Sequence, residues 1–271
     1  MHRIFLLRAY GDFVILLQAI IRSKHKGNYQ LVASKHLEEL YIALSSKIDI
    51  SGIQIEFVEF GITKTQLGLF TNKHFARMGT LQEVKTIKAY VEAHPNQNGI
   101  DYIEQDKRIG LLNLLTGHSF EAILFEQPIY ATYDLFFQNE PAKIYSPQGQ
   151  INKIVLFPDS RLPKKNIPDH LIEEIENQLT QKEKTIQAAY FKKINKSTDL
   201  SYDSFSRLIK IIEAADFIIG ADSLPIHICN LLQKPHYILY PTGYTKLFMT
   251  PFAKTNQLYG QFDYFDLSIL Q

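Results

Sequence analysis

The chain of 271 residues contains a single cysteine, no tryptophan and almost no net charge. One cysteine excludes a disulfide framework and any zinc site built from several cysteines, so we expect Cys229 to be a buried small hydrophobic residue. The 29 Lys and Arg against 28 Asp and Glu leave a net charge of +1, which argues against nucleic acid as a partner. A hydrophobic content of 45% excludes a disordered chain.

Long hydrophobic runs are also missing. The longest, Phe13 to Ile21, contains Gln18 and is shorter than the roughly 20 residues that span a bilayer. Arg8 and Asp12 precede it and no small-residue cleavage site follows, so it does not read as a signal peptide. The basic cluster Arg22–Lys26 is more typical of a helix end than of a membrane contact. We expect a cytoplasmic protein, in contact with a membrane surface at most peripherally.

Several motifs of common enzymes are absent. The sequence has no G-x-G-x-x-G, no Walker lysine loop, no H-E-x-x-H, no C-x-x-C and no G-x-S-x-G. It also lacks a D-x-D pair, the kind of carboxylate set that usually holds a divalent metal on a diphosphate. We therefore predict that the protein needs no metal and no cofactor.

Short apolar runs alternate with longer amphipathic segments, which is typical of parallel sheets flanked by helices. The predicted strands are residues 4–7, 29–33, 54–58, 122–125, 153–157, 185–191, 216–220 and 237–240. The predicted helices are residues 13–23, 35–46, 80–94, 169–181, 202–215 and 224–232.

The α/β pattern stops and restarts once. Residues 146–150 are rich in turn-forming types and poor in apolar ones, which suits a linker. We therefore predict two Rossmann-like domains that face each other, residues 1–148 and residues 149–271.

Gly11 and Asp12 follow the first predicted strand, at the edge where parallel sheets bind ligands. A carboxylate beside a glycine that permits a tight turn could act as a general base. Asp12 could equally cap the helix that follows, since aspartate is a preferred N-cap residue. The dipeptide alone leaves both roles open and favours the cap.

A polar loop between a buried strand and a helix, residues 158–168, carries Arg161, Lys164 and Lys165. Cations at a helix N-terminus oppose the helix dipole, so their presence is easier to understand if an anion binds there. A solvated surface loop is an equally good interpretation of the same residues.

The segment Gly220–His227 lies between a predicted strand and a predicted helix, whose first N–H groups could bind a phosphate. Asp222 and Ser223 could hydrogen-bond a ligand or cap the helix, and Pro225 suits the first helical turn. His227 would lie near the same site. A capped helix with a core histidine explains these residues slightly better when they are taken alone.

In this order and spacing, the three segments resemble glycosyltransferase family 9, the bacterial ADP-heptose:lipopolysaccharide heptosyltransferases and their relatives. The matching motifs are Arg8-Ala9-Tyr10-Gly11-Asp12, Lys165-Asn166-Ile167-Pro168, Asp222-Ser223-Leu224-Pro225-Ile226-His227 and Tyr240-Pro241-Thr242. The resemblance covers residues 1–30 and 151–242 well and residues 31–149 weakly.

The resemblance implies a GT-B fold, in which an N-terminal acceptor-binding domain and a C-terminal donor-binding domain face each other across a cleft. It implies metal-independent sugar transfer, with inversion, from a nucleotide-sugar to a cell-surface glycan or glycolipid such as lipopolysaccharide core. Asp12 would be the base. The donor and its phosphates would meet Lys165, Asp222, Ser223, Leu224, Pro225 and His227, with Gly11, Arg161, Lys164 and Thr242 as further candidates.

Two positions depart from the family pattern. Leu224 stands where the family has glycine, and a side chain there could obstruct the approach of a phosphate to the backbone. The segment Ala189–Lys193 lacks the acidic residue that the family has in the corresponding loop. These departures keep two alternatives open: a glycosyltransferase-like binding protein without catalysis, and a sugar-nucleotide hydrolase or epimerase of the same fold.

Overall fold

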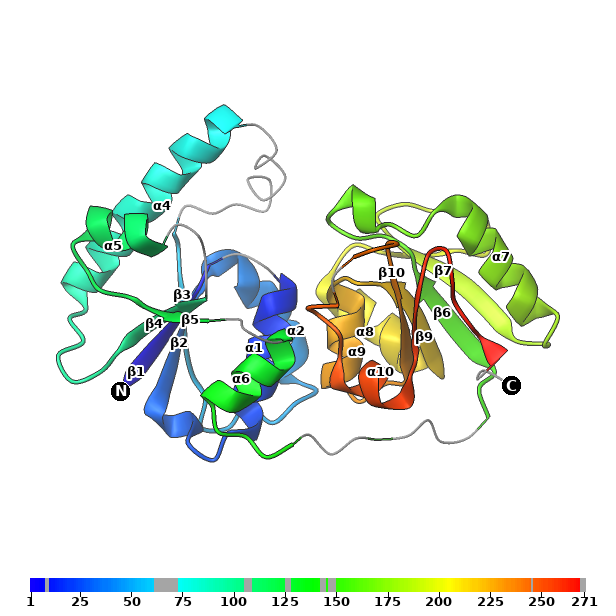
Figure 1. The fold of residues 1–271 in the computed structure, drawn as a ribbon, viewed down its shortest axis with the longest axis horizontal. Helices are drawn as coiled ribbons and strands as arrows, with labels where there is room; N and C mark the ends of the chain where they lie inside the picture. The colour runs from blue at the N-terminus through cyan, green and yellow to red at the C-terminus, as the bar shows by residue number, and fades with distance from the viewer. Residues whose placement is uncertain are drawn as a thin grey trace. The chain divides into compact units, whose positions relative to one another are not determined.

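The computed structural model describes residues 1–7, 10–60, 73–104, 109–124, 128–141, 145, 150–244 and 246–268 (Figure 1). The chain forms two compact units. The first comprises Met1–Ser45, Asp49–Glu126 and Thr132–Asn139, and the second comprises Ser46–Ile48, Gln127–Ala131 and Glu140–Gln271. The predicted linker falls largely on residues 146–149, which lie outside the described residues. From Glu140 onward the whole chain belongs to the second unit.

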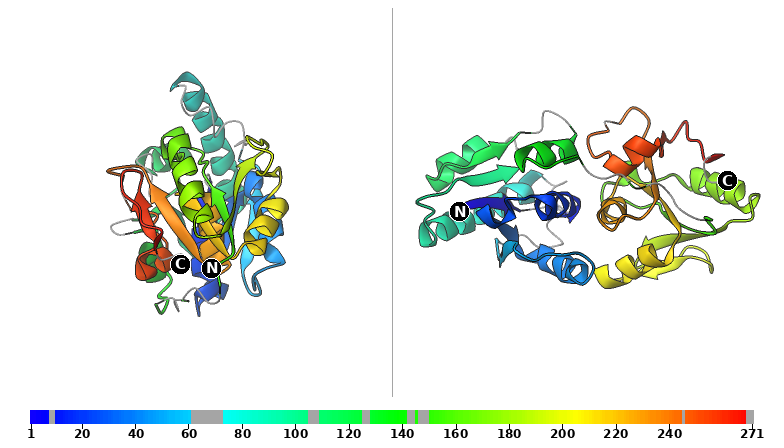
Figure 2. Two further views of the ribbon diagram at one scale, coloured as in Figure 1. Left: turned by 90° about the vertical axis from the view of Figure 1, so that its right-hand side faces the viewer. Right: turned by 90° about the horizontal axis from the view of Figure 1, so that it is seen from below.

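The first unit is built on a parallel five-stranded sheet in the order β3-β2-β1-β4-β5. Its strands are β1 (His2–Leu6), β2 (Tyr29–Ser34), β3 (Gln54–Val58), β4 (Asp101–Glu104) and β5 (Glu121–Ile123). The central strand β1 ends in Ile4, Phe5 and Leu6, which are apolar and buried, as expected for a parallel strand that is covered on both faces. Helices lie on both sides of the sheet (Figure 2).

The helical segments of the first unit connect successive strands in the crossovers that parallel pairing requires. They are α1 (Tyr10–Arg22), η1 (Lys26–Asn28), η2 (Lys35–Leu37), α2 (Glu38–Ser45), α4 (Lys73–Ala93) and α5 (Ile109–Thr116). The next helix, α6 (Ile129–Phe136), follows the last strand of this sheet, and only its part from Thr132 onward belongs to the first unit. The buried face of α1 packs Phe13, Leu16 and Ile20 with no exposed surface. Its apolar residues are therefore explained by core packing.

The second unit is built on a parallel six-stranded sheet in the order β11-β10-β9-β6-β7-β8. Its strands are β6 (Lys153–Phe157), β7 (Thr185–Phe191), β8 (Leu200–Tyr202), β9 (Phe217–Ala221), β10 (His236–Tyr240) and β11 (Tyr259–Gln261). Its helical segments are η3 (Pro163–Lys165), α7 (Asp169–Thr180), α8 (Phe205–Ala214), α9 (Leu224–Leu231) and α10 (Pro251–Asn256). Cys229, in α9, is buried as expected.

The prediction of parallel α/β sheets is confirmed, and β3, β6 and β7 have the predicted bounds. The helix predicted over residues 202–215 begins later, because Tyr202 ends strand β8 and Ser204 caps α8 by accepting from the Arg207 N–H. The strands β4, β8 and β11 and the helices α5, α6 and α10 were not predicted.

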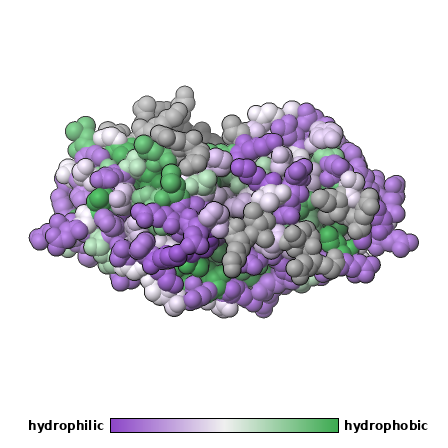
Figure 3. Space-filling model, turned by 60° about the horizontal axis from the view of Figure 1, so that its bottom comes forward, coloured by the Kyte–Doolittle hydropathy of each residue, from purple (hydrophilic) through white to green (hydrophobic). Residues whose placement is uncertain are grey.

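No helix among the described residues is long and apolar enough to cross a membrane. The face drawn in Figure 3 is largely hydrophilic, and hydrophobic residues reach it in separate patches. The large hydrophobic side chains with the greatest exposure are Ile42, Leu114, Leu135 and Tyr264.

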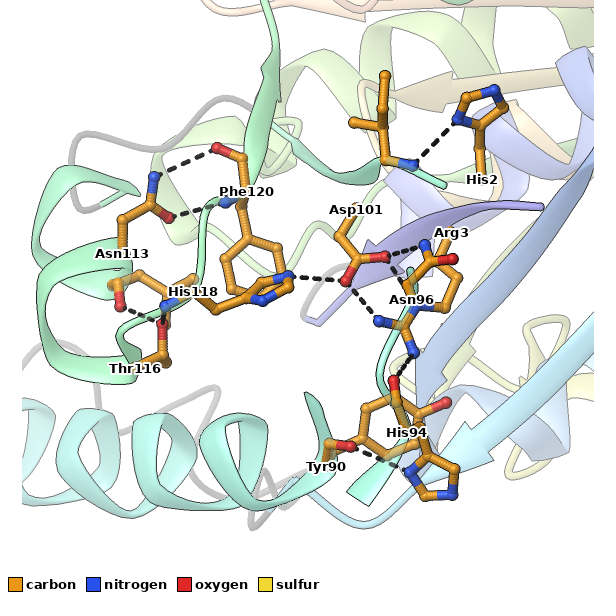
Figure 4. A network of polar contacts seen from close by, with 12 residues as sticks. His2, Arg3, Tyr90, His94, Asn96, Asp101, Asn113, Thr116, His118 and Phe120 are labelled. Atoms are coloured by element: carbon orange, nitrogen blue, oxygen red, sulfur yellow. Dashed lines mark hydrogen bonds and ion pairs between the residues drawn. The ribbon is translucent and has the colours of Figure 1, made fainter. Parts of the chain in front are cut away.

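A buried ionic network joins β1 to β4 at the amino-terminal edge of the first sheet (Figure 4). The Arg3 guanidinium donates to both carboxylate oxygens of Asp101, and the two side chains are 6% and 1% exposed. Asn96 and His118 also contact the Asp101 carboxylate, at 2.7 Å each. Burial raises the pKa of Asp101, but the hydrogen bonds from Arg3 and Asn96 outweigh it and hold that pKa below its ordinary value.

Replacing Asp101 by asparagine should lower the free energy of unfolding by about 3 kcal/mol at neutral pH, because Arg3 is left as a buried unpaired charge. Since the folded-state pKa of Asp101 is depressed, the stabilisation is full at neutral pH and disappears as the pH falls below about 4. Urea unfolding of D101N should therefore depend less on acid pH than unfolding of the wild type.

The matched control is Glu38→Gln, which breaks the exposed Lys35–Glu38 pair. This variant should change the free energy of unfolding by less than about 0.5 kcal/mol. Equal effects of D101N and E38Q would contradict the role given to the network.

Candidate functional site

Each sheet has one point where the chain reverses its direction of strand addition. In the second unit the chain starts at β6, adds β7 and β8 on one side, and then crosses to place β9 on the other side. In parallel sheets, ligands bind outside the carboxyl ends of the strands at such a point. Phe157 of β6 pairs with Gly220 of β9, so the loops after these two strands leave the same edge side by side.

Lys165 and Asp222 meet at this edge. Lys165 ends η3 in the loop after β6, Asp222 directly follows β9, and the Lys165 Nζ donates to Asp222 Oδ2 at 2.7 Å. The two side chains are 9% and 2% exposed. The Lys165 Nζ also lies 4.9 Å from the ring centre of Tyr244 and 5.3 Å from that of Phe248. Because a buried ion pair adds little net stability, these residue types are better explained by a charged ligand.

His227 extends the cluster. Its Nε2 lies 3.7 Å from Asp222 Oδ1, and its Nδ1 lies 3.0 Å from the hydroxyl of Tyr130. Burial lowers the pKa of His227 to about 4, more than the Asp222 charge raises it, so the ring is neutral at physiological pH. With Nε2 facing a carboxylate, the ring proton belongs on Nε2 and Nδ1 accepts from Tyr130. His227 is thus both a core residue and a neighbour of the Lys165–Asp222 pair.

Tyr130 is a residue of this cluster that sequence reasoning missed. It lies in the segment Gln127–Ala131 that packs with the second unit, and it is buried. It stands far from His227 along the chain and outside every motif, so no local signal marked it.

The N-terminus of α9 presents an unused hydroxyl. Ser223 is the N-cap residue in extended conformation, yet its side chain makes no capping bond. Its Oγ is buried, and among the described residues it has no hydrogen-bond partner. Ser223 therefore occupies the N-cap position of α9, but the prediction that its side chain caps the helix is wrong. Leu224 begins the helix, partly exposed, and Pro225 is buried in its first turn.

The remaining candidates of the second unit lie at the surface. Arg161 and Lys164 are exposed, and Lys164 Nζ lies 5.2 Å from the ring centre of Tyr244. Thr242 is exposed after β10. The loop after β6 is closed by a bond from the Ser160 N–H to Asn166 Oδ1, which leaves Lys165 as its buried cation.

In the first unit, Asp12 lies in the first turn of α1, which begins at Tyr10. The prediction of Asp12 as an N-cap is therefore wrong, because the helix starts before it. Gly11 is likewise inside the helix and not in a tight turn. A carboxylate in a first helical turn is stabilised by the helix dipole. The motif residues Arg8 and Ala9 lie outside the described residues.

Within the described part of the chain, no three His, Cys, Asp or Glu side chains gather as they would around a metal ion. The donor set at the second sheet edge consists of a lysine, a carboxylate, a neutral histidine and a hydroxyl. Such a set suits an anionic ligand that also carries hydroxyl groups.

Comparisons with known proteins give a likeness in structure alone. No family model matches the chain, and no curated protein matches its sequence. E. coli heptosyltransferase WaaC with ADP aligns over 96% of this chain and 93% of its own, with a TM-score of 0.59 and 12% identity. E. coli ADP-heptose lps heptosyltransferase II aligns over 96% and 90%, with a TM-score of 0.55 and 13% identity. The glycosyl transferase family 9 from Veillonella parvula DSM 2008 aligns over 90% and 81%, with a TM-score of 0.54 and 9% identity.

The two α/β units therefore have the fold of the GT-B glycosyltransferases. Among these, the fold is like that of the heptosyltransferases of glycosyltransferase family 9, as the order of the motifs predicted.

The neutral state of His227 can be tested directly. Because burial holds its pKa near 4, its ring resonances should not shift between about pH 5 and about pH 8 in NMR titrations. Removing the Tyr130 hydroxyl in Tyr130→Phe should leave Nδ1 without its donor and lower the free energy of unfolding by about 1 to 3 kcal/mol. A ring that titrates near its ordinary pKa would contradict the assignment.

Proposed function

We propose that the protein is a metal-independent, inverting glycosyltransferase that moves a sugar from a nucleotide-sugar to a bacterial cell-surface glycan, such as lipopolysaccharide core. The observation that carries the proposal is the buried Lys165–Asp222 pair beside the unused Ser223 hydroxyl, at the ligand-binding edge of the second sheet. The shared fold supports it, since WaaC was solved with ADP and with ADP-2-deoxy-2-fluoro heptose.

The second unit would hold the donor. As the bond to the sugar breaks, negative charge grows on the leaving diphosphate, and a preorganised cation stabilises that charge. Lys165 would supply the cation and the N-terminus of α9 its partial positive charge, which is the work that a metal does in other transferases. Asp222 would orient Lys165 and contact the donor sugar, while His227 and Tyr130 keep Asp222 in place.

The first unit would hold the acceptor. A sugar hydroxyl is a weak nucleophile until a base takes its proton in the transition state. Asp12 would take that proton, and the oxygen would form its new bond to the anomeric carbon from the side opposite the leaving diphosphate. This in-line attack inverts the anomeric configuration. A glycolipid acceptor would bring the protein to the inner membrane surface without a membrane-spanning helix.

Ser223→Ala separates donor binding from stability. Because the Ser223 Oγ has no partner among the described residues, removing it should change the free energy of unfolding by less than about 0.5 kcal/mol. It should weaken binding of the nucleoside diphosphate about tenfold, since a hydroxyl–phosphate hydrogen bond is lost. Calorimetry with a panel of nucleoside diphosphates measures this effect.

The control for this experiment is Ser45→Ala, which removes a hydroxyl bonded to the Ile42 carbonyl in the first unit and should leave nucleotide affinity unchanged. Wild-type protein that binds no nucleoside diphosphate would contradict the donor site.

Asp12→Asn tests the base. The variant should lower the transfer rate by roughly 10²- to 10⁴-fold, because asparagine cannot accept the hydroxyl proton. Its affinity for the nucleoside diphosphate should be unchanged, since the donor residues lie in the other unit. Asp49→Asn, at an exposed site of the first unit, is the matched control and should transfer sugar at the wild-type rate. Wild-type activity in D12N would rule out Asp12 as the base.

A binding protein without catalysis is the second candidate, and Leu224 is the observation that favours it. Its side chain stands at the first position of α9, where a glycine would let a phosphate approach the backbone. Nucleoside diphosphate binding with no turnover of any nucleotide-sugar would support this candidate. Turnover of the donor in the absence of an acceptor would instead indicate a hydrolase or epimerase.

A further inference from the structure

The connection between β7 and β8 is a surface loop that is both basic and apolar. Residues 191–198 contain no acidic residue and three lysines, Lys192, Lys193 and Lys196. All eight residues of this segment are exposed, and Phe191 and Ile194 are 53% and 60% exposed. In a chain whose net charge is only +1, the loop is a local concentration of positive charge beside exposed apolar surface.

The loop is held in one shape by contacts at both of its ends. Lys192 has a left-handed backbone, with a φ of 54°, and its N–H donates to the Tyr202 carbonyl at 2.9 Å. The buried Asp199 carboxylate accepts from the backbone N–H groups of Asn195 and Lys196 at 2.9 and 2.7 Å. A lysine in a left-handed conformation costs free energy, so the surrounding structure imposes this shape. The exposed side chains are therefore presented by an ordered loop.

The positive charge continues into the loop after β6. Lys193 Nζ lies 3.0 Å from Asp159 Oδ2, which links the two loops. Arg161 and Lys164 follow Asp159 and are exposed, and Leu162 between them is 38% exposed. Two of the cations in the two loops have carboxylate partners: Lys193 pairs with Asp159, and Lys196 pairs with Glu176. The two loops together thus carry an excess of positive charge.

We propose that residues 161–164 and 191–196 form a docking surface for an anionic lipid bilayer. Lysine and arginine side chains are attracted to the negative surface of such a membrane. Exposed aromatic and aliphatic side chains beside them enter the interface between the head groups and the acyl chains. Phosphate binding would explain the cations but not the exposure of Phe191 and Ile194, so the combination points to lipid. The surface goes beyond the proposed function and does not depend on it.

The other basic segment of the chain, residues 22–26, lacks this combination. It contains no apolar residue, and its Arg22 pairs with Asp134 at 2.8 Å. It therefore serves as the comparison for the docking surface.

Sedimentation with lipid vesicles measures docking. The wild type should bind vesicles of phosphatidylcholine mixed with phosphatidylglycerol about tenfold more tightly than vesicles of phosphatidylcholine alone, since only the former attract the cations. Binding should weaken at about 1 M salt, where the Debye length falls to about 3 Å.

The double variant Lys192→Asn/Ile194→Ser removes one cation and one apolar side chain. Asparagine tolerates the left-handed backbone and both positions are exposed, so thermal unfolding should be unchanged. Affinity for the anionic vesicles should fall about tenfold or more. The matched control, Lys24→Asn/Ile42→Ser, removes the same side-chain types from exposed positions of the first unit and should bind as the wild type does.

Insertion can be observed directly because the chain has no tryptophan. With Ile194→Trp, the fluorescence emission should move to shorter wavelength when the anionic vesicles are added, since tryptophan favours the membrane interface. Ile42→Trp replaces an isoleucine that is 62% exposed in the first unit and should show no such shift.

The inference is overturned if the wild type does not bind the anionic vesicles, if the double variant binds them as tightly as the wild type, or if the two tryptophans respond alike. A loss of nucleoside diphosphate affinity in the double variant would also overturn it, because the loops would then belong to the donor site. Vesicle binding without sugar transfer would leave the docking surface standing and refute the transferase. Sugar transfer by a protein that binds no vesicles would do the reverse.

Discussion

Parallel strand pairing is the constraint on which both candidate sites depend. Consecutive parallel strands need a crossover connection, so all strands of a sheet end at the same edge and the segments that follow them gather there. In each unit the chain begins at a central strand and later reverses its direction of strand addition, at β1 with β4 and at β6 with β9. The candidate site residues follow these strands: Asp12 follows β1 in one unit, and Lys165 and Asp222 follow β6 and β9 in the other.

The two edges carry different electrostatics. In the second unit a buried cation and carboxylate neutralise each other, and a neutral histidine and an unused hydroxyl complete the set. In the first unit the corresponding residue is Asp12, whose carboxylate lies in the first turn of α1, at the positive end of the helix dipole. The buried Arg3–Asp101 network lies at the opposite edge of that sheet, where it joins β1 to β4.

The fold was predictable from the sequence where burial is uniform. Residues 154–157 form a continuous apolar run because β6 is central and covered on both faces, and the predicted bounds of β6, 153–157, were correct. Strand β4 was missed because Asp101 and Glu104 make it look polar; Arg3 and Tyr133, which satisfy them, come from distant parts of the chain. The aromatic helix α6 lacks a polar face and gave no helical signal.

The residues of the candidate site were predictable where they stand in local sequence motifs. Lys165, Asp222 and His227 stand in local motifs, and the structure brings them together. Tyr130 contacts His227 from a segment far away in sequence, and no local pattern encodes such a contact. The capping role of Asp12 failed because α1 begins before it, and the first residue of a helix is its least certain feature in sequence. Ser223 does occupy the N-cap position of α9, but its side chain makes no capping bond.

The lone thiol has a practical consequence. Cys229 is fully buried in α9, and burial raises its pKa far above that of an ordinary cysteine. The thiol is therefore neither ionised at neutral pH nor accessible to reagents. The native protein should therefore not react with maleimides or other alkylating labels while it stays folded. A cysteine introduced at any exposed position would be the only reactive one, and a spectroscopic probe could be attached there without first removing a native residue.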